Sequence, residues 1–425
     1  MSIVSELISR MQSIEAISRE VITLVPSENL LSPLARTPFL MDLYSRYSLD
    51  DLDLFGHWVF QGGRDIGEVE HQFVRPMLSR LCDARHVSCK PISGLQGMWV
   101  ALSAVCNPGD VALILPASEG GHACTGRILQ RAGIRCEYLP FEAPGRVDLK
   151  ACEEMLIRLS PSVVYVDQST FLFPLDVTEL AALCRRQGDV CLYVDTSHSN
   201  GLIFGGVIPN PLHQGAHGFG GSTHKTFPGP HKATFATNCE GLSRKFNSSA
   251  SDLISHAHGA EVLALALTLA EFEECGGPTM VQRMVDGARI LAEEIWRHGV
   301  PVLERERNFT ACHQMWVPAP KSDMKELSER FFAAGLHVNL FHQLPNYPGP
   351  SFRLGTNEVA RLGFTDEAIR DLAGCFVDCW KNAAPLSVIR KRVKALRAQF
   401  SEPTYCMDRE ALLKRMRGGL TRFAA

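Results

Sequence analysis

Short apolar runs alternate with helical patterns through the first half of the chain. Three of the runs, residues 111–117, 162–168 and 191–198, are rich in β-branched residues and are followed by polar residues. Runs of this length and composition predict strands that are buried on both faces, as in a parallel sheet. Helical patterns lie between them at residues 148–159 and 175–187. Strand, helix and strand in succession predict an open α/β sheet with helices on both faces.

A different pattern begins near Cys275. A long amphipathic helix is predicted over residues 278–299, and strand-like segments follow at 311–318 and 337–341, which indicates a smaller α+β domain. The first twenty residues alternate apolar and charged positions and predict another amphipathic helix. We therefore predict three parts: an N-terminal helix and arm (1–30), a large α/β domain (31–274) and a small C-terminal α+β domain (275–425).

Composition and charge narrow the class of protein. The chain has 425 residues, of which 45% are hydrophobic, so it can bury a sizeable core. Its formal charge of −3 is not concentrated in blocks, so neither nucleic acid nor an anionic membrane is an expected partner. No signal peptide pattern and no spanning run of ~18 apolar residues is found, which predicts a cytoplasmic protein that acts on small molecules. The 14 cysteines lie singly and predict reduced thiols and no metal site.

Lys225 is the first candidate for chemistry. It lies among small residues, polar residues and glycines in the segment 216–238, between two predicted strands. Pyridoxal-phosphate (PLP) chemistry needs an amine that reaches the cofactor aldehyde, loses its proton and later acts as a base. Most lysines only keep a surface soluble, so this interpretation depends on the residues around Lys225.

Asp195 supplies that support, because it ends a buried strand ahead of Lys225. A carboxylate there would keep a pyridine nitrogen protonated and make the ring accept electrons. The alternative is a helix cap or a loop-closing aspartate, and the flanking TSH and THK sequences favour the cofactor. Ser169 and Glu119 also lie at or just past strand ends, where open α/β sheets bind ligands.

Two glycine-containing turns add weaker candidates. Ser93 and Gly94 precede a predicted helix whose free amides would bind the cofactor phosphate. His122 follows the strand at 111–117, where its ring could stack on the cofactor. A single histidine is more often a packed core or surface residue, so His122 alone decides little.

Six motifs in order, PSEN, SGLQ, GGH, VDTSH, STHK and FRLGT, span nearly the whole chain. In this order and spacing the chain resembles the serine hydroxymethyltransferase family of fold-type I PLP enzymes, including its relatives that act as threonine transaldolases. The resemblance implies the aspartate aminotransferase-like fold, with a mostly parallel sheet. It also implies that Lys225 forms the imine with PLP, that Asp195 faces the pyridine nitrogen, and that His122 stacks on the ring. Further cofactor contacts are implied for Ser169 and His198 at the phenolic oxygen, and for His224, Ser93 and Gly94 at the phosphate.

The resemblance implies substrate contacts as well. Arg353, in SFRLGT, would form a two-pronged pair with the substrate α-carboxylate, assisted by Ser27 in VPSEN. The alternative for Arg353 is a surface ion pair. Tyr47 takes the place of a family tyrosine that serves catalysis and substrate binding. A homodimer with shared active sites is also implied, in which His256 and His258 are candidates for reaching across.

Four departures from the family concern the side of the site that receives folate. Leu49 stands where the family has the glutamate that handles protons in hydroxymethyl transfer, and Val59 and Phe60 replace a tyrosine pair. Met98 replaces an asparagine, and His231 replaces an arginine. The cofactor residues are intact, so PLP is the expected cofactor, whereas tetrahydrofolate is in doubt.

We therefore expect a PLP enzyme that cleaves a β-hydroxy-α-amino acid such as threonine or serine by a retro-aldol reaction. The glycyl unit would then be transferred to a second aldehyde, which is transaldolase chemistry. The main alternative is a serine or α-methylserine hydroxymethyltransferase that uses tetrahydrofolate. A racemase, a glycine-transferring biosynthetic enzyme and a PLP-binding scaffold protein without catalysis are further alternatives.

Overall fold

The structure is a computed structural model that describes residues 2–49, 51–188 and 190–408. The chain forms two compact units. The larger contains Asn29–Gln282 and the described residues from Tyr405 on, and the smaller contains residues 2–28 and Arg283–Thr404. The N-terminal segment therefore groups with the C-terminal elements. The three-part division at residues 30 and 274 stays a prediction.

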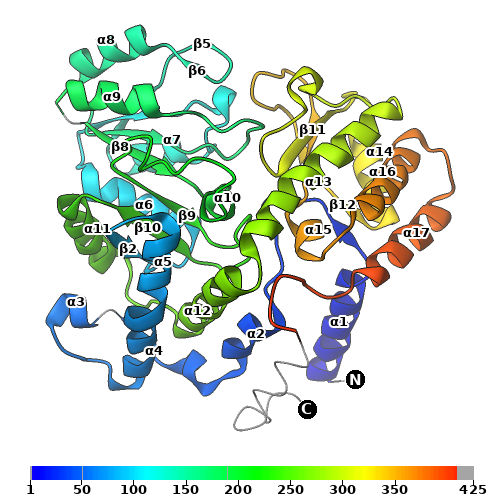
Figure 1. Cartoon of the computed structure of the whole chain (residues 1–425), viewed down its shortest axis with the longest axis horizontal. Helices are drawn as coiled ribbons and strands as arrows, with labels where there is room; N and C mark the ends of the chain where they lie inside the picture. The colour runs from blue at the N-terminus through cyan, green and yellow to red at the C-terminus, as the bar shows by residue number, and fades with distance from the viewer. Residues whose placement is uncertain (1, 50, 189, 409–425) are drawn as a thin grey trace. The chain divides into compact units, whose positions relative to one another are not determined.

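A seven-stranded sheet forms the centre of the larger unit (Figure 1), in the order β2-β10-β9-β8-β7-β3-β4. The strands from β9 to β4 are parallel, and β10 and β2 continue the sheet antiparallel at one edge. The strands are β2 (His86–Ser88), β3 (Val111–Ile114), β4 (Arg135–Tyr138), β7 (Val163–Val166), β8 (Cys191–Asp195), β9 (Gly218–Ser222) and β10 (Ala233–Thr237).

The predicted α/β fold is confirmed. The three apolar runs contain β3, β7 and β8, and the two helical patterns contain α8 (Leu149–Leu159) and α9 (Thr178–Arg186). Every residue of β3 and β7 is buried. This burial explains why their sequences are continuously apolar instead of alternating. The other helices of this unit are α2 (Pro33–Arg36), α3 (Asp51–Phe55), α4 (Arg64–Val69), α5 (Arg75–Cys82), α6 (Gly94–Val105), α7 (Thr125–Arg131), α10 (Asn200–Phe204), α11 (Glu240–Leu253) and α12 (Gly259–Glu274).

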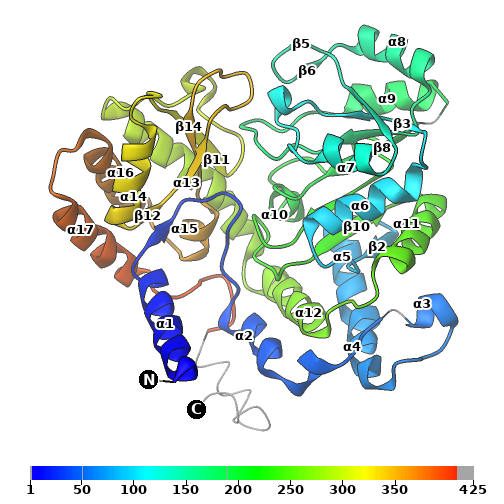
Figure 2. The same ribbon diagram turned by 180° about the vertical axis from the view of Figure 1, so that it is seen from behind.

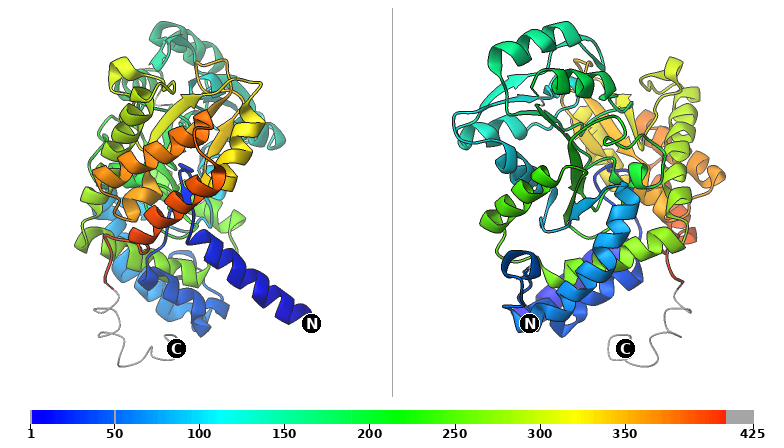
Figure 3. Two further views of the ribbon diagram at one scale, coloured as in Figure 1. Left: turned by 90° about the vertical axis from the view of Figure 1, so that its right-hand side faces the viewer. Right: turned by 60° about the vertical axis from the view of Figure 1, so that its left-hand side comes forward.

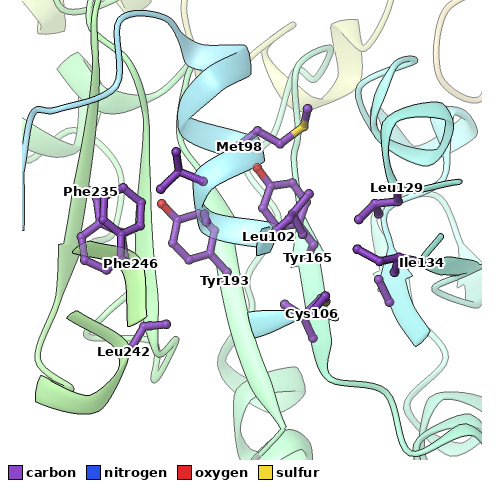
Figure 4. Packing of buried hydrophobic residues seen from close by; sticks show 14 of the residues in the cluster. Met98, Leu102, Cys106, Leu129, Ile134, Tyr165, Tyr193, Phe235, Leu242 and Phe246 are labelled. Carbon is purple, nitrogen blue, oxygen red and sulfur yellow. The ribbon is translucent and has the colours of Figure 1, made fainter. Parts of the chain in front are cut away.

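Helices α6, α7, α8, α9 and α11 lie around the sheet (Figure 2), and two apolar clusters pack against it. One contains residues of α6, α7 and α11, and the other contains residues of α8 and α9. In the first, Met98 and Leu102 of α6 lie near the rings of Tyr165 and Tyr193 (Figure 4), which stack with centroids 5.7 Å apart. Each fully buried large aliphatic side chain contributes about 1.5–3 kcal/mol by leaving water, so these clusters hold the strands in place beneath the site.

The smaller unit is built on the antiparallel sheet β11-β14-β13. β11 (Gln314–Pro318) and β13 (Asn339–Phe341) pair with β14 (Ser351–Gly355), and β1 (Ile22–Thr23) pairs in parallel with β12 (Leu336–His337). The helices are α1 (Ile3–Ser18), α14 (Met324–Ala334), α15 (Asn357–Arg361), α16 (Asp366–Lys381) and α17 (Leu386–Gln399). The boundary between the units falls within α13 (Gly277–Arg297).

The amphipathic helix predicted at the N-terminus is present as α1, which begins after a Ser2 cap. None of its residues is buried. It extends away from the rest of its own unit (Figure 3). Its exposed apolar residues are Ile3, Val4, Leu7, Ile8, Met11, Ile14 and Ile17. Within the described residues, no helix combines the length and apolar character needed to cross a membrane.

Candidate active site

A pocket of the larger unit lies at the carboxyl ends of the parallel strands, where such sheets bind ligands. Its walls come from the segments that follow β3, β7, β8 and β9 and from the start of α6. Six residues predicted from the sequence line it together: Gly94, His122, Ser169, Asp195, His198 and Lys225. The parallel order of the strands brings them together although they span more than 130 positions of the chain.

Asp195 is the last residue of β8, and two donors fix its carboxylate. The hydroxyl of Tyr165 donates to Oδ2 at 2.9 Å, and the backbone amide of Ser197 donates to Oδ1 at 2.8 Å. Tyr165 is itself fully buried in the core cluster. The orientation of the carboxylate is therefore set by the packed core beneath the site.

Lys225 follows β9 in a turn whose backbone is held at several points. Its carbonyl accepts a hydrogen bond from Asn29 Nδ2 at 2.6 Å. The next residue, Thr226, accepts the backbone amide of Gly201 on its hydroxyl at 3.1 Å. The backbone on either side of the lysine is thus fixed, while its side chain lines the pocket.

The start of α6 approaches the sheet closely. Ser93 caps the helix by accepting the amide of Gln96 on Oγ at 3.2 Å. A Cβ added to Gly94 would lie 2.0 Å from Ser222 Oγ and 3.3 Å from Ser197 Oγ, so a side chain at position 94 would require the Ser222 hydroxyl to move. Amides at a helix start beside two hydroxyl groups form a corner that suits a phosphate.

His224 lies next to Lys225 in the chain but does not line the pocket. Its ring packs on His231 with centroids 4.1 Å apart, and its Nδ1 is buried without a hydrogen-bond partner in the described chain. Burial, and to a smaller extent His231 and Lys225, lower the pKa of His224 to about 3. The imidazole is therefore neutral and can hydrogen-bond to a ligand.

The remaining cofactor candidates surround the pocket with different exposure. His122 is exposed after the turn that follows β3. Ser169 donates from Oγ to the carbonyl of Gly120 at 3.3 Å. His198 is buried, and its carbonyl accepts from Thr226 Oγ1 at 3.2 Å.

Tyr47 is not among the residues that line this pocket. It is 43% exposed, and its ring stacks on His256 with centroids 4.8 Å apart and packs on Phe60 at 4.5 Å. The amide of Ser48 lies 3.1 Å from His256 Nδ1. Leu49, at the position of the family glutamate, directly follows Ser48 in the chain. The His256 imidazole therefore contacts the residue next to the position where the family has its carboxylate.

Arg353 belongs to the smaller unit, on β14. It is only 6% exposed, so the alternative of a surface ion pair is wrong. Its Nε and Nη2 donate to Asn339 Oδ1 at 3.0 and 2.7 Å, and its guanidinium carbon lies 4.6 Å from the centre of the Phe341 ring. Burial lowers the pKa of Arg353 to about 10, which leaves the side chain charged at neutral pH.

Ser27 lies in the same unit, in a segment that packs against the end of β14. Gly355 donates its amide to the carbonyl of Leu24 at 2.8 Å, and Asn357 Nδ2 donates to the carbonyl of Glu28. A Cβ at Gly355 would lie 2.5 Å from Cα of Pro26. The VPSEN and SFRLGT motifs therefore touch each other.

Several pocket residues had not been predicted as part of the site: Leu95, Asp167, Gln168, Ser197 and Ser222. Met98 also lines the pocket, although it was noted only as a departure from the family. Asp167 follows β7 as an acidic residue after a buried run, which is the same signal that identified Asp195. Serines 197 and 222 carry no such signal, because their role depends on the position of Gly94.

The residues present fit PLP. The pocket has a lysine, a carboxylate held by two donors, and a polar corner beside the start of α6 that a Cβ at position 94 would enter. The buried, unpartnered Nδ1 of His224 adds a group that requires a ligand or a water molecule for a hydrogen bond.

Comparisons with known proteins agree with this fit. The family model for serine hydroxymethyltransferase matches residues 3–300. The chain is 36% identical to an L-threonine:uridine-5'-aldehyde transaldolase from Amycolatopsis sp., over 83% of this chain and 86% of that protein. It is 33% identical to the serine hydroxymethyltransferase of Methanopyrus kandleri, over 91% of each chain.

The fold is also found in a solved structure. The crystal structure of L-threonine transaldolase from Pseudomonas fluorescens in its internal aldimine state superposes with a TM-score of 0.88, at 24% identity, over 98% of this chain and 97% of that one. The family match, the two relatives and this fold all point the same way. The chain therefore belongs to the serine hydroxymethyltransferase family and is a PLP-dependent transferase with the fold-type I architecture.

Proposed function

We propose that the protein is a transaldolase that acts on β-hydroxy-α-amino acids, with threonine as the first donor to test. The bond between Cα and Cβ of the donor breaks, and the donor hydroxyl loses its proton as the first aldehyde leaves. The glycyl unit then forms a new bond to a second aldehyde, whose oxygen takes up a proton. One observation carries this proposal: six of the eight expected cofactor residues line one pocket, whereas Leu49 replaces the carboxylate needed for folate chemistry.

PLP, when bound, supplies an aldehyde for amines and a ring that stabilises negative charge at Cα. In this proposal Lys225 holds the aldehyde end and Asp195 keeps the ring nitrogen protonated. His122 covers one face of the ring, and Ser169 and His198 bind the phenolic oxygen. The phosphate is held by Ser93, Gly94 and His224, together with the hydroxyl groups of Ser197 and Ser222.

Arg353 and Ser27 bind the α-carboxylate of the amino acid. A planar guanidinium matches the two oxygens of a carboxylate, and Asn339 and Phe341 preorganise it. Holding the carboxylate fixes which bond of Cα stands perpendicular to the ring, and this decides which bond breaks.

We also propose a cytoplasmic homodimer with shared active sites. The apolar side chains of α1 are exposed in the single chain and suit a surface of a second copy. Tyr47, His256 and His258 form an exposed or half-buried cluster outside the pocket, which fits residues that complete the neighbour's site. Tyr47 would then act on substrate in the partner subunit.

The second candidate is a tetrahydrofolate-dependent serine hydroxymethyltransferase, which the relative from Methanopyrus kandleri favours. The two candidates differ in the acceptor. A transaldolase produces a new β-hydroxy-α-amino acid from threonine and an aldehyde without folate. A hydroxymethyltransferase exchanges the one-carbon unit of serine only when tetrahydrofolate is present.

The first experiment tests the cofactor and the acceptor together. Borohydride reduction of the purified protein should attach a pyridoxyl group to Lys225, and Lys225→Ala should lose both this label and turnover. Threonine, serine and glycine are then offered separately with a panel of aldehydes, with and without tetrahydrofolate. Product formed only with folate contradicts the transaldolase, and PLP binding without turnover of any donor would support a scaffold role.

A further inference from the structure

A second carboxyl group lies beside Asp195. Asp167 directly follows β7, and the register pairs Val166 of β7 with Val194 of β8, so the two aspartates are neighbours on adjacent parallel strands. Two residues earlier, Tyr165 and Tyr193 stack with an interplanar angle of 1°, as side chains on one face of a sheet do. Both aspartates line the same pocket.

The surroundings of the two carboxyl groups differ. Asp195 is half-buried and accepts two hydrogen bonds, from the Tyr165 hydroxyl and the Ser197 amide. Asp167 is 3% exposed, and its Oδ2 accepts from the hydroxyl of Thr125 while its Oδ1 has no side-chain partner. In the described chain, Asp167 forms no ion pair with a basic residue.

Two neighbouring carboxyl groups in a buried site rarely both ionise, because each charge opposes the other. The better-solvated and better-bonded member keeps the charge, and here that member is Asp195. Burial raises the pKa of Asp167 well above its ordinary value; the bond from Thr125 opposes the rise and the charge of Asp195 adds to it. The backbone amides of His122 and of Asp167 itself, as donors to the carboxyl group, also oppose the rise.

We propose that Asp167 is a positioning residue of the cofactor pocket that acts as a neutral carboxylic acid, so that Asp195 carries the single negative charge of this wall. Asp167 also fixes the wall itself. The Thr125 hydroxyl that it binds lies 3.3 Å from Met98 Sδ, which links the starts of α6 and α7 at the pocket. This inference rests on the proposed PLP site.

The test applies one substitution to both carboxyl groups. An amide has nearly the shape and the charge of a neutral carboxylic acid, so Asp167→Asn should keep the site intact, whereas Asp195→Asn removes a charge. The apo forms of the wild type and both variants are titrated with PLP, and the absorbance of the bound cofactor is followed from acid to alkaline pH. The measurements are the dissociation constant of PLP and the midpoint of the absorbance change.

For Asp167→Asn we expect PLP affinity within about threefold of the wild type and a midpoint within about 0.3 pH unit, because no charge is lost. For Asp195→Asn we expect affinity weaker by about tenfold or more and a midpoint lower by about one unit or more, because a nearby negative charge favours protonated groups. Asp167→Ala leaves the Thr125 hydroxyl without its acceptor and should weaken binding without lowering the midpoint.

A midpoint that falls by about one unit in Asp167→Asn shows that Asp167 is ionised and overturns the inference. Unchanged binding and spectra in Asp195→Asn contradict the cofactor assignment instead, so the two failures are distinct. If Asp167→Asn does not fold, infrared spectroscopy of the wild-type protein with isotopically labelled aspartate decides the matter. A carboxylic acid carbonyl band at neutral pH supports the inference, and its absence overturns it.

Discussion

At the scale of single residues, the surroundings of Arg353 and His224 decide whether each side chain carries a charge. Arg353 is buried and yet charged, because Asn339 and the Phe341 ring take the place of water around its guanidinium. His224 is half-buried, with its Nδ1 out of contact with water, and is neutral. In the proposed site, Arg353 offers a positive charge to the substrate carboxylate. His224 offers the cofactor phosphate only a hydrogen bond.

We predict that Arg353→Ala raises the KM for the amino acid about 30-fold or more, because a buried charge-assisted pair is lost. Arg353→Lys should recover only part of this loss, since an ammonium group lacks the planar fork. Steady-state kinetics measure both variants, with Arg244→Ala on the exposed face of α11 as the control. An unchanged KM in Arg353→Ala would remove this residue from the substrate site.

His224 should make the protein less stable in acid. Its pKa is about 3 in the folded chain, against an ordinary value of 6.5. Between these two pH values the imidazole is protonated in the unfolded chain and neutral in the folded chain. The contribution to stability is complete above pH 6.5 and falls as the pH drops toward 3, by up to about 1.4 kcal/mol per pH unit. Urea unfolding of the apo protein at several pH values should show a shallower dependence in His224→Asn. An equal dependence in both proteins would contradict the burial of this imidazole.

At the scale of elements, the close approach of α6 to the end of β9 forms the polar corner proposed for the phosphate. The sequence predicts the turn and the helix, because Ser93 and Gly94 are a cap and a permissive glycine. It does not predict Ser222 as the neighbour of Gly94, because that contact depends on the order of strands in the sheet. For the same reason β2 and the antiparallel edge were not predicted, while the apolar runs of β3, β7 and β8 were.

Gly94→Ala should weaken PLP binding by about tenfold or more, because its Cβ would overlap the Ser222 hydroxyl. Removing that hydroxyl in the double variant Gly94→Ala/Ser222→Ala should restore part of the affinity. The dissociation constant of PLP from each apo protein measures the effect. Because the Ser222 hydroxyl is also proposed to contact the phosphate, Ser222→Ala alone is the reference, and an alanine at position 94 that weakens binding equally with and without this hydroxyl would show that the clash is not with Ser222.

At the scale of the whole molecule, the helix that the sequence predicts at the N-terminus is present, but none of its residues is buried and its apolar side chains are largely exposed in the described part of the chain. A hydrophobic pattern can predict that a face will be buried, but it does not say which molecule buries it. The same limit applies to Tyr47. Its motif was recognisable, whereas its position outside the pocket of its own chain was not.

Leu7→Glu/Met11→Glu should therefore weaken self-association, measured by sedimentation velocity across a range of protein concentrations. Both side chains are exposed, so the stability of the single chain should change little. Ile157→Glu, on the exposed face of α8, is the matched control. Identical sedimentation of all three proteins would exclude α1 from any subunit interface.

The hydrogen bond from Tyr165 to Asp195 couples the packing of the core to the orientation of a carboxylate in the pocket. Tyr165 is packed among the apolar residues that stabilise the sheet, and its hydroxyl holds the carboxylate of the site. With Asp195 at the ring nitrogen as proposed, substitutions around Tyr165 that stabilise the core should also shift the absorbance of bound PLP.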